Sequence, residues 1–371
     1  MATKAVLAFQ KAPHPVGAQP GAGCSRRTLL QRLAIAVGVL ATRGALAAPP
    51  ETAVYVGVET AATGQSRATF FTASGARAAS LPLTFRAHGL AQHRGQLAVF
   101  PRRPGNRFAL IDLKTLTPTA TVTAPPNRHF YGHGAFTRDG AHLLVPENDL
   151  ETLAGHIAIY DRAGTRRGAL PLPGAGPHEI IRAATADRFH IALGGLETHP
   201  DYGRTPLNAA TFVSQTVTLE WESAALTAAD APLQSEGVSL RHLAEDAAGR
   251  LYVGGQTVDG ARAAHSNVLF VIENGVSRAI PLGGRLAGYV SSVAAAGETV
   301  VVTSKESGRA LTLRNGDLIA ETALDGASAA GLGAAHRAVS GYTLLSLDGT
   351  AVRAADAHEF DNHGLMLTQP R

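Results

Sequence analysis

The chain has 371 residues, of which 45% are hydrophobic, and a mean hydropathy of +0.04. These values fit a globular protein with a full core, in one large domain or two ordinary ones. Its isoelectric point of about 9.4 is basic, but residues 1–47 contain six Lys or Arg and no acid. The remainder has 27 basic and 29 acidic residues. Because nucleic-acid binding needs a basic surface, the composition argues against a nucleic-acid partner.

Residues 1–47 have the three-part order of an export signal. Ser25-Arg26-Arg27 and the following "TLL" form a twin-arginine pattern, an apolar segment spans 33–41, and Ala45-Leu46-Ala47 is a small-x-small cleavage site. The apolar segment is too short to span a membrane. We therefore predict a twin-arginine signal peptide at 1–47, cleaved near Ala47, and a monomeric periplasmic domain at 48–371 with no membrane span.

Cysteine use restricts the cofactors of this domain. Cys24 is the only cysteine and lies in the predicted signal peptide. The mature chain therefore lacks the thiolates that an iron–sulfur cluster, a thioether-linked haem or a cysteine zinc site requires. Any metal must be held by histidine, carboxylate or water.

Short β-rich segments follow one another from residue 53 onward. Examples are "AVYVGV" (53–58), "QLAVFP" (96–101), "HIAIYD" (156–161), "NVLFVI" (267–272) and "TVVVTS" (299–304). They are rich in β-branched residues and are bounded by Gly, Pro, Asp and Asn, which is typical of strands. No segment has a sustained helical period of apolar residues. The pattern predicts an all-β chain.

The strands recur in repeats of about 45 residues. Repeats start at His88, His133 and His178, then at His242 after an insertion, and at Tyr289, with a weaker copy near Gly333. Four strands per 40–45 residues is the sequence pattern of a β-propeller. The segment 361–369 resembles a first strand without partners, and the N-terminal strands lack one. We therefore predict a seven-bladed β-propeller closed by the C-terminal strand; the alternative is six blades, because the sixth copy is short.

Histidine occurs at most of these strand starts, and the first strand of each propeller blade lines the central channel. We expect His88, His133, His178, His242 and His363 to converge at one mouth of the channel and to form a metal site. Tyr289 takes the matching place in another repeat, and His336 is the nearest candidate in the weakest one. Neutral imidazole suits Cu, Fe, Zn and Ni. The alternative is a structural role for each histidine, such as a turn hydrogen bond repeated with the blade.

Polar neighbours of the histidines are candidates for binding a cofactor. We select Tyr289, Arg241 and Glu179, although alternation along a strand would turn Glu179 away from its neighbour His178. Glu147 and Asp149 are expected either to support a ligand histidine or to cap a turn. Arg102 and Arg103 are expected to pair with those acids or to attract an anion. The insertion "GLETHPDYGRTPLN" is either a binding loop over the channel or a self-packed loop with an Asp201–Arg204 pair.

The motifs "FPRRPG", "FYGHGAFTRDGAHLLVPEND", "GPHEI", "GGLETHPDYGR" and "DNHG" resemble, in this order, a family of exported proteins catalogued as domain-of-unknown-function family 1513. The resemblance covers nearly all of the mature chain and implies a periplasmic propeller without assigned chemistry. Members are often encoded beside imelysin-type proteins, which implies a role in iron acquisition and a periplasmic iron-uptake partner. The blade-start histidines are also similar to those of the propeller of nitrous-oxide reductase, where such histidines hold copper, but this chain lacks the second copper domain of that enzyme.

Three functions remain open from the sequence. The first is a periplasmic propeller that binds a transition metal, with iron or copper favoured, or a metal-bearing ligand at a histidine-lined mouth. The second is a non-catalytic scaffold that docks proteins of an iron-uptake system. The third is a propeller hydrolase of the lactonase type, which needs a metal held mainly by carboxylates and Asn. Whether the protein is an enzyme is open.

Overall fold

The computed structural model describes residues 53–184, 186–203, 205–228, 237–258, 267–355 and 357–368. The predicted signal peptide and Arg204 lie outside these ranges. Within them there is no helix long and apolar enough to cross a membrane. A 3-10 turn, η2 (Pro200–Tyr202), lies in the insertion.

β-strands form nearly all of the described regular structure. Their bounds are β1 (Ala53–Ala61), β2 (Ser66–Thr72), β3 (Arg77–Leu83), β4 (Ala87–His93), β5 (Gln96–Pro101), β6 (Arg107–Asp112), β7 (Thr117–Thr123), β8 (Arg128–Phe130), β9 (Ala135–Phe136), β10 (His142–Asp149), β11 (Gly155–Asp161), β12 (Arg166–Pro171), β13 (Pro177–Arg182), β14 (Arg188–Leu193), β15 (Gln215–Glu220), β16 (Ala225–Ala228), β17 (Val238–Glu245), β18 (Leu251–Thr257), β19 (Leu269–Glu273), β20 (Val276–Ala279), β21 (Ser292–Ala296), β22 (Thr299–Ser304), β23 (Arg309–Arg314), β24 (Asp317–Ala323), β25 (Ala329–Leu332), β26 (Arg337–Ser340), β27 (Leu344–Leu347), β28 (Thr350–Arg353) and β29 (His358–Met366).

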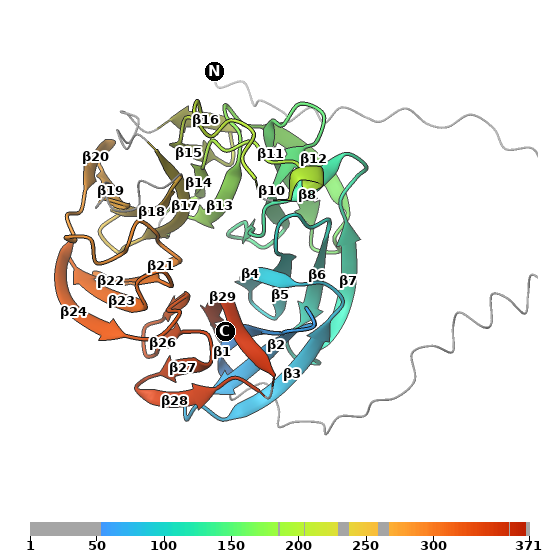
Figure 1. Ribbon diagram of the computed structural model, residues 1–371. Coiled ribbons are helices and arrows are strands. Elements are labelled where there is room, and N and C mark those ends of the chain that lie inside the picture. The colour runs from blue at the N-terminus through green and yellow to red at the C-terminus, as the bar shows by residue number, and fades with distance from the viewer. Residues whose placement is uncertain are drawn as a thin grey trace, which may run out of the picture. The chain divides into compact units, whose positions relative to one another are not determined.

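Seven antiparallel sheets surround a central channel, so the chain is a seven-bladed β-propeller (Figure 1). From the channel outward, blade 1 contains β29, β1, β2 and β3, and blade 2 contains β4 to β7. Blade 3 contains β8 to β12, with its innermost strand split into β8 and β9. Blades 4, 5, 6 and 7 contain β13–β16, β17–β20, β21–β24 and β25–β28. The predicted all-β class and seven blades are confirmed, and the six-bladed alternative is wrong.

Burial decreases from the middle strands of each blade toward the rim. In blade 6, β22 is buried over nearly its whole length, whereas the outermost strand β24 is exposed throughout. The middle strands lie between neighbouring blades, and strands covered on both faces are hydrophobic in nearly continuous runs. Between blades 2 and 3, for example, Phe108 packs against Phe130 and Tyr160 at ring-centroid distances of 5.3 and 5.2 Å. The hydrophobic core therefore consists of layers between blades.

The two ends of the propeller domain pair within blade 1. β29 runs antiparallel to β1, with Tyr55 opposite Met366 and Gly57 opposite Gly364. This pairing covers the inner edge of β1, which would otherwise be open. Closure by the C-terminal strand is thus confirmed (Figure 1). It places His363 at the cavity in the channel.

The sixth copy of the repeat, which forms blade 7, begins four residues before its predicted start near Gly333. Its innermost strand β25 begins at Ala329, and Gly333 lies in the following turn, where its N–H donates to the carbonyl of His336. All four strands of this blade are four residues long, which explains the weak pattern. The placement of His336 at a blade start is therefore wrong: it lies in the turn, and its Nδ1 is 2.6 Å from Oδ2 of Asp348.

Candidate metal centre

Five histidines from five blades meet in the channel, and we call them the histidine ring. In blade order they are His363, His88, His133, His178 and His242. The distances between successive ring centroids are 4.5, 5.0, 5.2 and 5.1 Å, and His242 lies 4.9 Å from His363. All five side chains are buried, with at most 8% of any residue exposed. Five blades are therefore enough to close the ring across the channel.

Each ring histidine lies at an irregularity of its innermost strand. The register of strand pairing shifts between Ala87 and Leu90 in β4, between Pro177 and Glu179 in β13, and between Leu240 and His242 in β17. In β29, it shifts in the stretch opposite Gly57 to Glu59, and in blade 3 the ring residue lies in the gap between β8 and β9. A β-bulge redirects side chains out of the usual alternation. The bulges therefore account for histidines that point into the channel.

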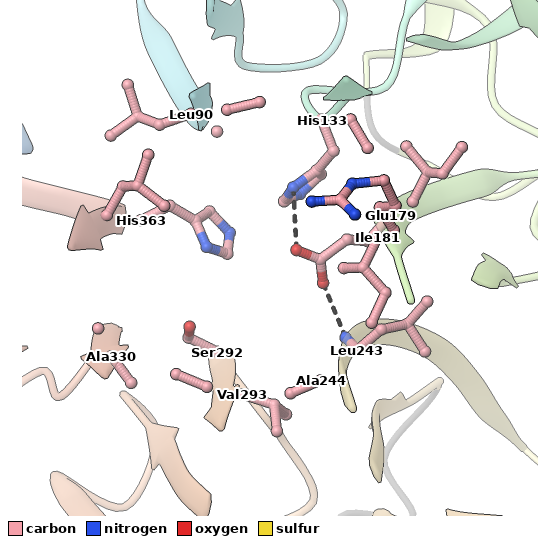
Figure 2. Close-up of a pocket in the computed structure, with 18 of the residues that line it drawn as sticks. Leu90, His133, Glu179, Ile181, Leu243, Ala244, Ser292, Val293, Ala330 and His363 are labelled. Atoms are coloured by element: carbon pink, nitrogen blue, oxygen red, sulfur yellow. Dashed lines mark hydrogen bonds and ion pairs between the residues drawn. The ribbon is translucent and has the colours of Figure 1, made fainter. Parts of the chain in front are cut away.

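Blades 6 and 7 have neither a ring histidine nor such a bulge. β21 and β25 pair with their second strands in an unbroken register. Small residues line the cavity there, and Figure 2 shows Ser292 and Ala330 on the side opposite Glu179. The coincidence of bulge and histidine in five blades, and the lack of both in two, indicates a local adaptation rather than a turn contact that every blade repeats.

Glycines let the inner strands of blades 2 and 3 approach closely. A Cβ added to Gly89 would lie 2.2 Å from the carbonyl oxygen of Gly132, and one added to Gly132 would lie 2.7 Å from Cδ2 of His88. Gly132 also has a φ of +103°, which favours glycine. The glycines beside His88 and His133 thus permit the close packing that places the two imidazoles 5.0 Å apart.

Four ring histidines have a buried nitrogen without a partner among the described residues. These atoms are Nδ1 of His88 and His178, and Nε2 of His133 and His363. Nδ1 of His242 makes no hydrogen bond either, but it lies 3.4 Å from Oε2 of Glu179. Buried polar atoms are normally paired, so four such atoms in one cluster need an explanation. Two three-residue groups have ligand atoms within 4.8 Å of one another: His88, His133 and His363, and His133, His178 and His242. Nitrogens around a tetrahedral zinc lie about 3.4 Å apart, so small ring rotations would suffice to bind an ion.

Glu179 lies beside the ring, contrary to the expectation that it would face away from it. Its Oε1 is 3.3 Å from Nδ1 of His133, and its Oε2 is 3.4 Å from Nδ1 of His242 (Figure 2). The N–H of Leu243 donates to Oε2 at 2.8 Å. The bulge at His178 breaks the alternation on which the expectation depended. A carboxylate that accepts from Nδ1–H of His133 leaves the lone pair on its Nε2, which is the arrangement common around metal-binding histidines.

Burial and neighbouring charges keep most of the ring neutral. Burial, together with the positive charge of neighbouring histidines and arginines, holds the pKa of His88, His178 and His363 well below its ordinary value. Burial also lowers the pKa of His242, and Glu179 opposes this effect. Although burial alone would raise the pKa of Glu179, its histidine neighbours outweigh burial and lower it. At pH 7 the site thus offers the neutral imidazoles of these four histidines together with the carboxylate of Glu179, which is a donor set for a cation.

A cavity of about 360 Å³ lies on one side of the ring, within the channel. The innermost strands of all seven blades line it, and His133, Glu179 and His363 face it (Figure 2). A smaller pocket of about 50 Å³ lies against His88, His178 and His242, and its other lining residues include Arg241 and Tyr289. The candidate cofactor residues therefore lie at two different places: Glu179 at the larger cavity, and Arg241 and Tyr289 at the smaller one. Tyr289 precedes β21 and forms an isolated bridge with Gln256.

Glu147 and Asp149, the acids of the motif "FYGHGAFTRDGAHLLVPEND", have structural roles. Glu147 is fully buried, and its carboxylate lies 2.6 Å from Arg166 and 3.5 Å from Arg128. Asp149 pairs with Arg128 at 2.8 Å and accepts hydrogen bonds from the N–H groups of Glu151 and Thr152. The alternative prediction of a turn cap is therefore confirmed for Asp149. The prediction that one of the two acids supports a ligand histidine is wrong, because the arginines and turn amides occupy both carboxylates.

Arg102 and Arg103 do not form the predicted pairs with Glu147 and Asp149. Arg102 instead forms an ion pair with Asp361 at 3.0 Å, and Arg103 lies over the ring of Tyr131 at 5.6 Å. Both line the smaller pocket beside the ring.

The described part of the insertion is packed on itself. Asn208 accepts from the N–H of Glu197 and donates to the carbonyl of Gly195, and the N–H of Asp201 donates to Nδ1 of His199. The predicted Asp201–Arg204 pair lies outside the described residues. Contact with blade 3 comes from Thr198, whose hydroxyl is 3.4 Å from that of Tyr131.

His129, outside the ring, makes the unfolding free energy sensitive to pH. His129 is 4% exposed, and burial, Arg103 and His199 lower the pKa of its imidazole from 6.5 to about 4. The unfolded state therefore binds more protons between these values, so stability falls as pH drops from 6.5 to 4, by up to about 3 kcal/mol from this group. We expect His129→Gln to lose less stability than the wild type between pH 7 and 4.5 in urea titrations. Equal losses would show that this histidine does not contribute.

Together, the fold and the ring define a class: a β-propeller whose channel holds clustered histidines that could bind a metal ion. A family model described as "Protein of unknown function (DUF1513)" matches residues 81–367, and the chain belongs to this family. A search of curated proteins finds no match to the chain.

Solved structures share the fold at low sequence identity. They include hydrazine synthase of Kuenenia stuttgartiensis (TM-score 0.57, 12% identity, 86% of this chain and 99% of that chain). A chain of the nidogen/laminin complex has a TM-score of 0.53 and 10% identity, over 85% of this chain and 99% of that chain. The dihydro-heme d1 dehydrogenase NirN in complex with DHE has a TM-score of 0.52 and 15% identity, over 88% and 78%. At these identities the likeness shows the fold alone.

Proposed function

We propose that this protein binds a transition-metal ion at the histidine ring and handles iron or copper in the periplasm. The observation that carries the proposal is the cluster of five buried imidazoles, in which one nitrogen each of His88, His133, His178 and His363 has no hydrogen-bond partner among the described residues. Structural histidines would be expected to have hydrogen-bond partners. The ring would instead leave four buried nitrogens unsatisfied unless an ion or water binds them.

The donor set favours ions that accept imidazole. Both three-residue groups consist of histidine alone and share His133, so this residue is the central ligand of the site. Imidazole donors suit copper, iron, zinc and nickel, whereas a lactonase-type site needs mainly oxygen donors. A bound ion would supply Lewis acidity, or electron transfer if it is redox-active. The residues of this chain would position it, with Glu179 orienting His133.

The leader and the family resemblance support a periplasmic role. The twin-arginine pattern at Ser25-Arg26-Arg27 would export the domain after folding. The genes that often lie beside those of the family favour iron as the bound metal and an imelysin-type protein as the partner. The resemblance of the blade-start histidines to those of the nitrous-oxide reductase propeller favours copper instead. We propose iron or copper as the cargo, in a monomer that meets its partner in the periplasm.

Titration of metal-free protein with Cu²⁺, Fe²⁺ under anaerobic conditions, and Zn²⁺ tests the proposal. We expect at least one of these ions to bind at one per chain and to raise the melting temperature. Absence of binding for all three would refute the proposed function.

Glu179→Gln is expected to weaken the same ion by about 10- to 100-fold, because loss of an acceptor behind a ligand histidine has that effect. The calorimetric dissociation constant measures it. Glu245→Gln, which changes another acid lining the channel cavity, is the matched control and should change affinity much less. Equal effects of the two substitutions would indicate a general electrostatic contribution and not orientation of His133.

A further inference from the structure

The two sides of the histidine ring differ in the space and in the ligands that they offer to a metal ion. On one side lies the channel cavity of about 360 Å³, which Glu179 and Glu245 line. On the other lies the pocket of about 50 Å³ beside Tyr289, whose lining contains no carboxylate among the residues that the structure describes. An ion with six water ligands needs about 180 Å³, at about 30 Å³ per water. Of the two spaces, only the channel cavity can therefore hold a hydrated ion next to the ring.

The walls of the channel cavity include the open edges of the inner strands. The innermost strand of each blade pairs with a neighbouring strand on one side only. The free edge of such a strand presents unpaired N–H and C=O groups. These innermost strands line the channel cavity in all seven blades. A hydrated cation in the cavity thus meets hydrogen-bonding groups and carbonyl oxygens as well as side chains.

Two carboxylates lie at two depths of this cavity. Glu179 lies beside the ring, 3.3 Å from Nδ1 of His133 and 3.4 Å from Nδ1 of His242. Glu245 is the last residue of β17, three residues beyond His242, and the strand pairing between these two residues is regular. At the usual rise along a strand, three residues span about 10 Å. The cavity therefore offers a cation one carboxylate at the ring and a second one further along the channel.

Glu245 has no cationic partner that would cancel its charge. Its Oε2 accepts a hydrogen bond from the N–H of Ala184 at 2.7 Å, and its Oε1 is 3.5 Å from Nε2 of His190. Burial lowers the pKa of His190, and Glu245 only partly opposes this effect, so the imidazole is neutral at pH 7. Arg182 lines the same cavity but forms no ion pair with Glu245.

We infer that metal ions enter and leave the ring through the channel cavity, and that Glu245 is an entry residue which an incoming ion contacts before it reaches Glu179. This inference rests on the proposed metal function. A carboxylate about 5–10 Å from a divalent ion in water changes its rate of passage roughly 4- to 16-fold. Because the ion passes Glu245 and does not stay there, loss of this charge should slow association and dissociation alike and change affinity much less.

Stopped-flow mixing of metal-free protein with Cu²⁺ tests the role of Glu245. Cu²⁺ is the probe because it has the highest affinity for nitrogen ligands in its series. At pH 7 and low ionic strength, we expect Glu245→Gln to lower both rate constants by roughly 4- to 16-fold, with dissociation measured by transfer to a chelator. Added salt should reduce this difference, because it screens the charge. Arg182→Gln, which removes the opposite charge from the same cavity, should slow neither rate.

Bulky substitutions on the two sides of the ring test the route itself. Ser292 lies on the cavity wall opposite Glu179 (Figure 2). We expect Ser292→Leu to slow both rates at least as much as Glu245→Gln does, whereas Ser292→Ala, which adds no bulk, should not. Gln256 lines the smaller pocket, and Gln256→Phe should leave both rates unchanged. Melting temperatures of the metal-free variants show that each is folded; if Ser292→Leu does not fold, the Glu245 and Gln256 variants decide.

The route and the metal function fail in different ways. If Cu²⁺ does not bind the wild type, the metal function is refuted and the route with it. If Cu²⁺ binds but Glu245→Gln and Ser292→Leu leave both rates unchanged, or Gln256→Phe slows them instead, the route is refuted and metal binding stands. If Glu245→Gln slows association alone, with an equal loss of affinity, the residue acts by long-range attraction and its assignment as an entry residue is overturned.

Discussion

Replacing His133 by alanine is expected to weaken metal binding by more than about 100-fold. This residue belongs to both three-histidine groups and contacts Glu179, so its loss removes a ligand from either possible site. Because loss of a supporting residue alone costs about 10- to 100-fold, loss of the shared ligand should cost more. Metal titration followed by calorimetry, and the metal-induced change in melting temperature, measure the effect.

The matched control is His336→Ala. His336 is also a histidine of a blade hairpin, but it lies in a turn and pairs with Asp348 outside the ring. A surface pair of this kind contributes about 0–1 kcal/mol, so both metal affinity and folding should be nearly unchanged. If His133→Ala instead lowered the stability of metal-free protein by several kcal/mol and left metal uptake intact, the ring would be structural.

Glu147→Gln is expected to lower the free energy of unfolding by about 2–4 kcal/mol. Glu147 is fully buried and accepts from Arg166 through both carboxylate oxygens at 2.8 and 2.6 Å. Removing its charge leaves the largely buried guanidinium of Arg166 without this counterion, which is among the costlier single changes, whereas Arg128 keeps its pair with Asp149. Urea unfolding curves at pH 7 measure the loss.

The control for this substitution is Glu220→Gln. Glu220 pairs with Arg188 at 3.5 Å, but both side chains are nearly half exposed, so we expect a change below about 1 kcal/mol. Folded Glu147→Gln should bind metal as the wild type does, because Glu147 contacts arginines and not the ring. Loss of metal binding in the folded variant would return Glu147 to a supporting role.

The architecture could be predicted from the sequence because its signals repeat. The 45-residue spacing of His88, His133 and His178 and the unpartnered strand at the C-terminus sufficed for seven blades and their closure. Blade 7 was the weak point, since strands of four residues carry too few alternations to set their own bounds.

Convergence of the ring was also predictable, since equivalent positions of a repeat meet at the axis of a propeller. What the sequence did not reveal was the bulge at each histidine. A bulge adds a residue to one strand, and it therefore breaks the period-two rule by which Glu179 was expected to face away. The only sequence signal for a role of Glu179 at the ring was that it directly follows the ring histidine His178. The partners of Glu147 could likewise not be predicted from the sequence, because Arg166 lies 19 residues away on β12.

The most direct test of the central claim is the metal content of the protein after folding and export in its native host. Elemental analysis of the purified protein, without added metal or chelator, should find about one iron or copper per chain, and a His133→Ala sample prepared in parallel should contain little of either. Iron, copper and zinc near zero in the wild-type protein, with no stabilisation by added ions, would contradict the account and favour an interaction scaffold with structural histidines.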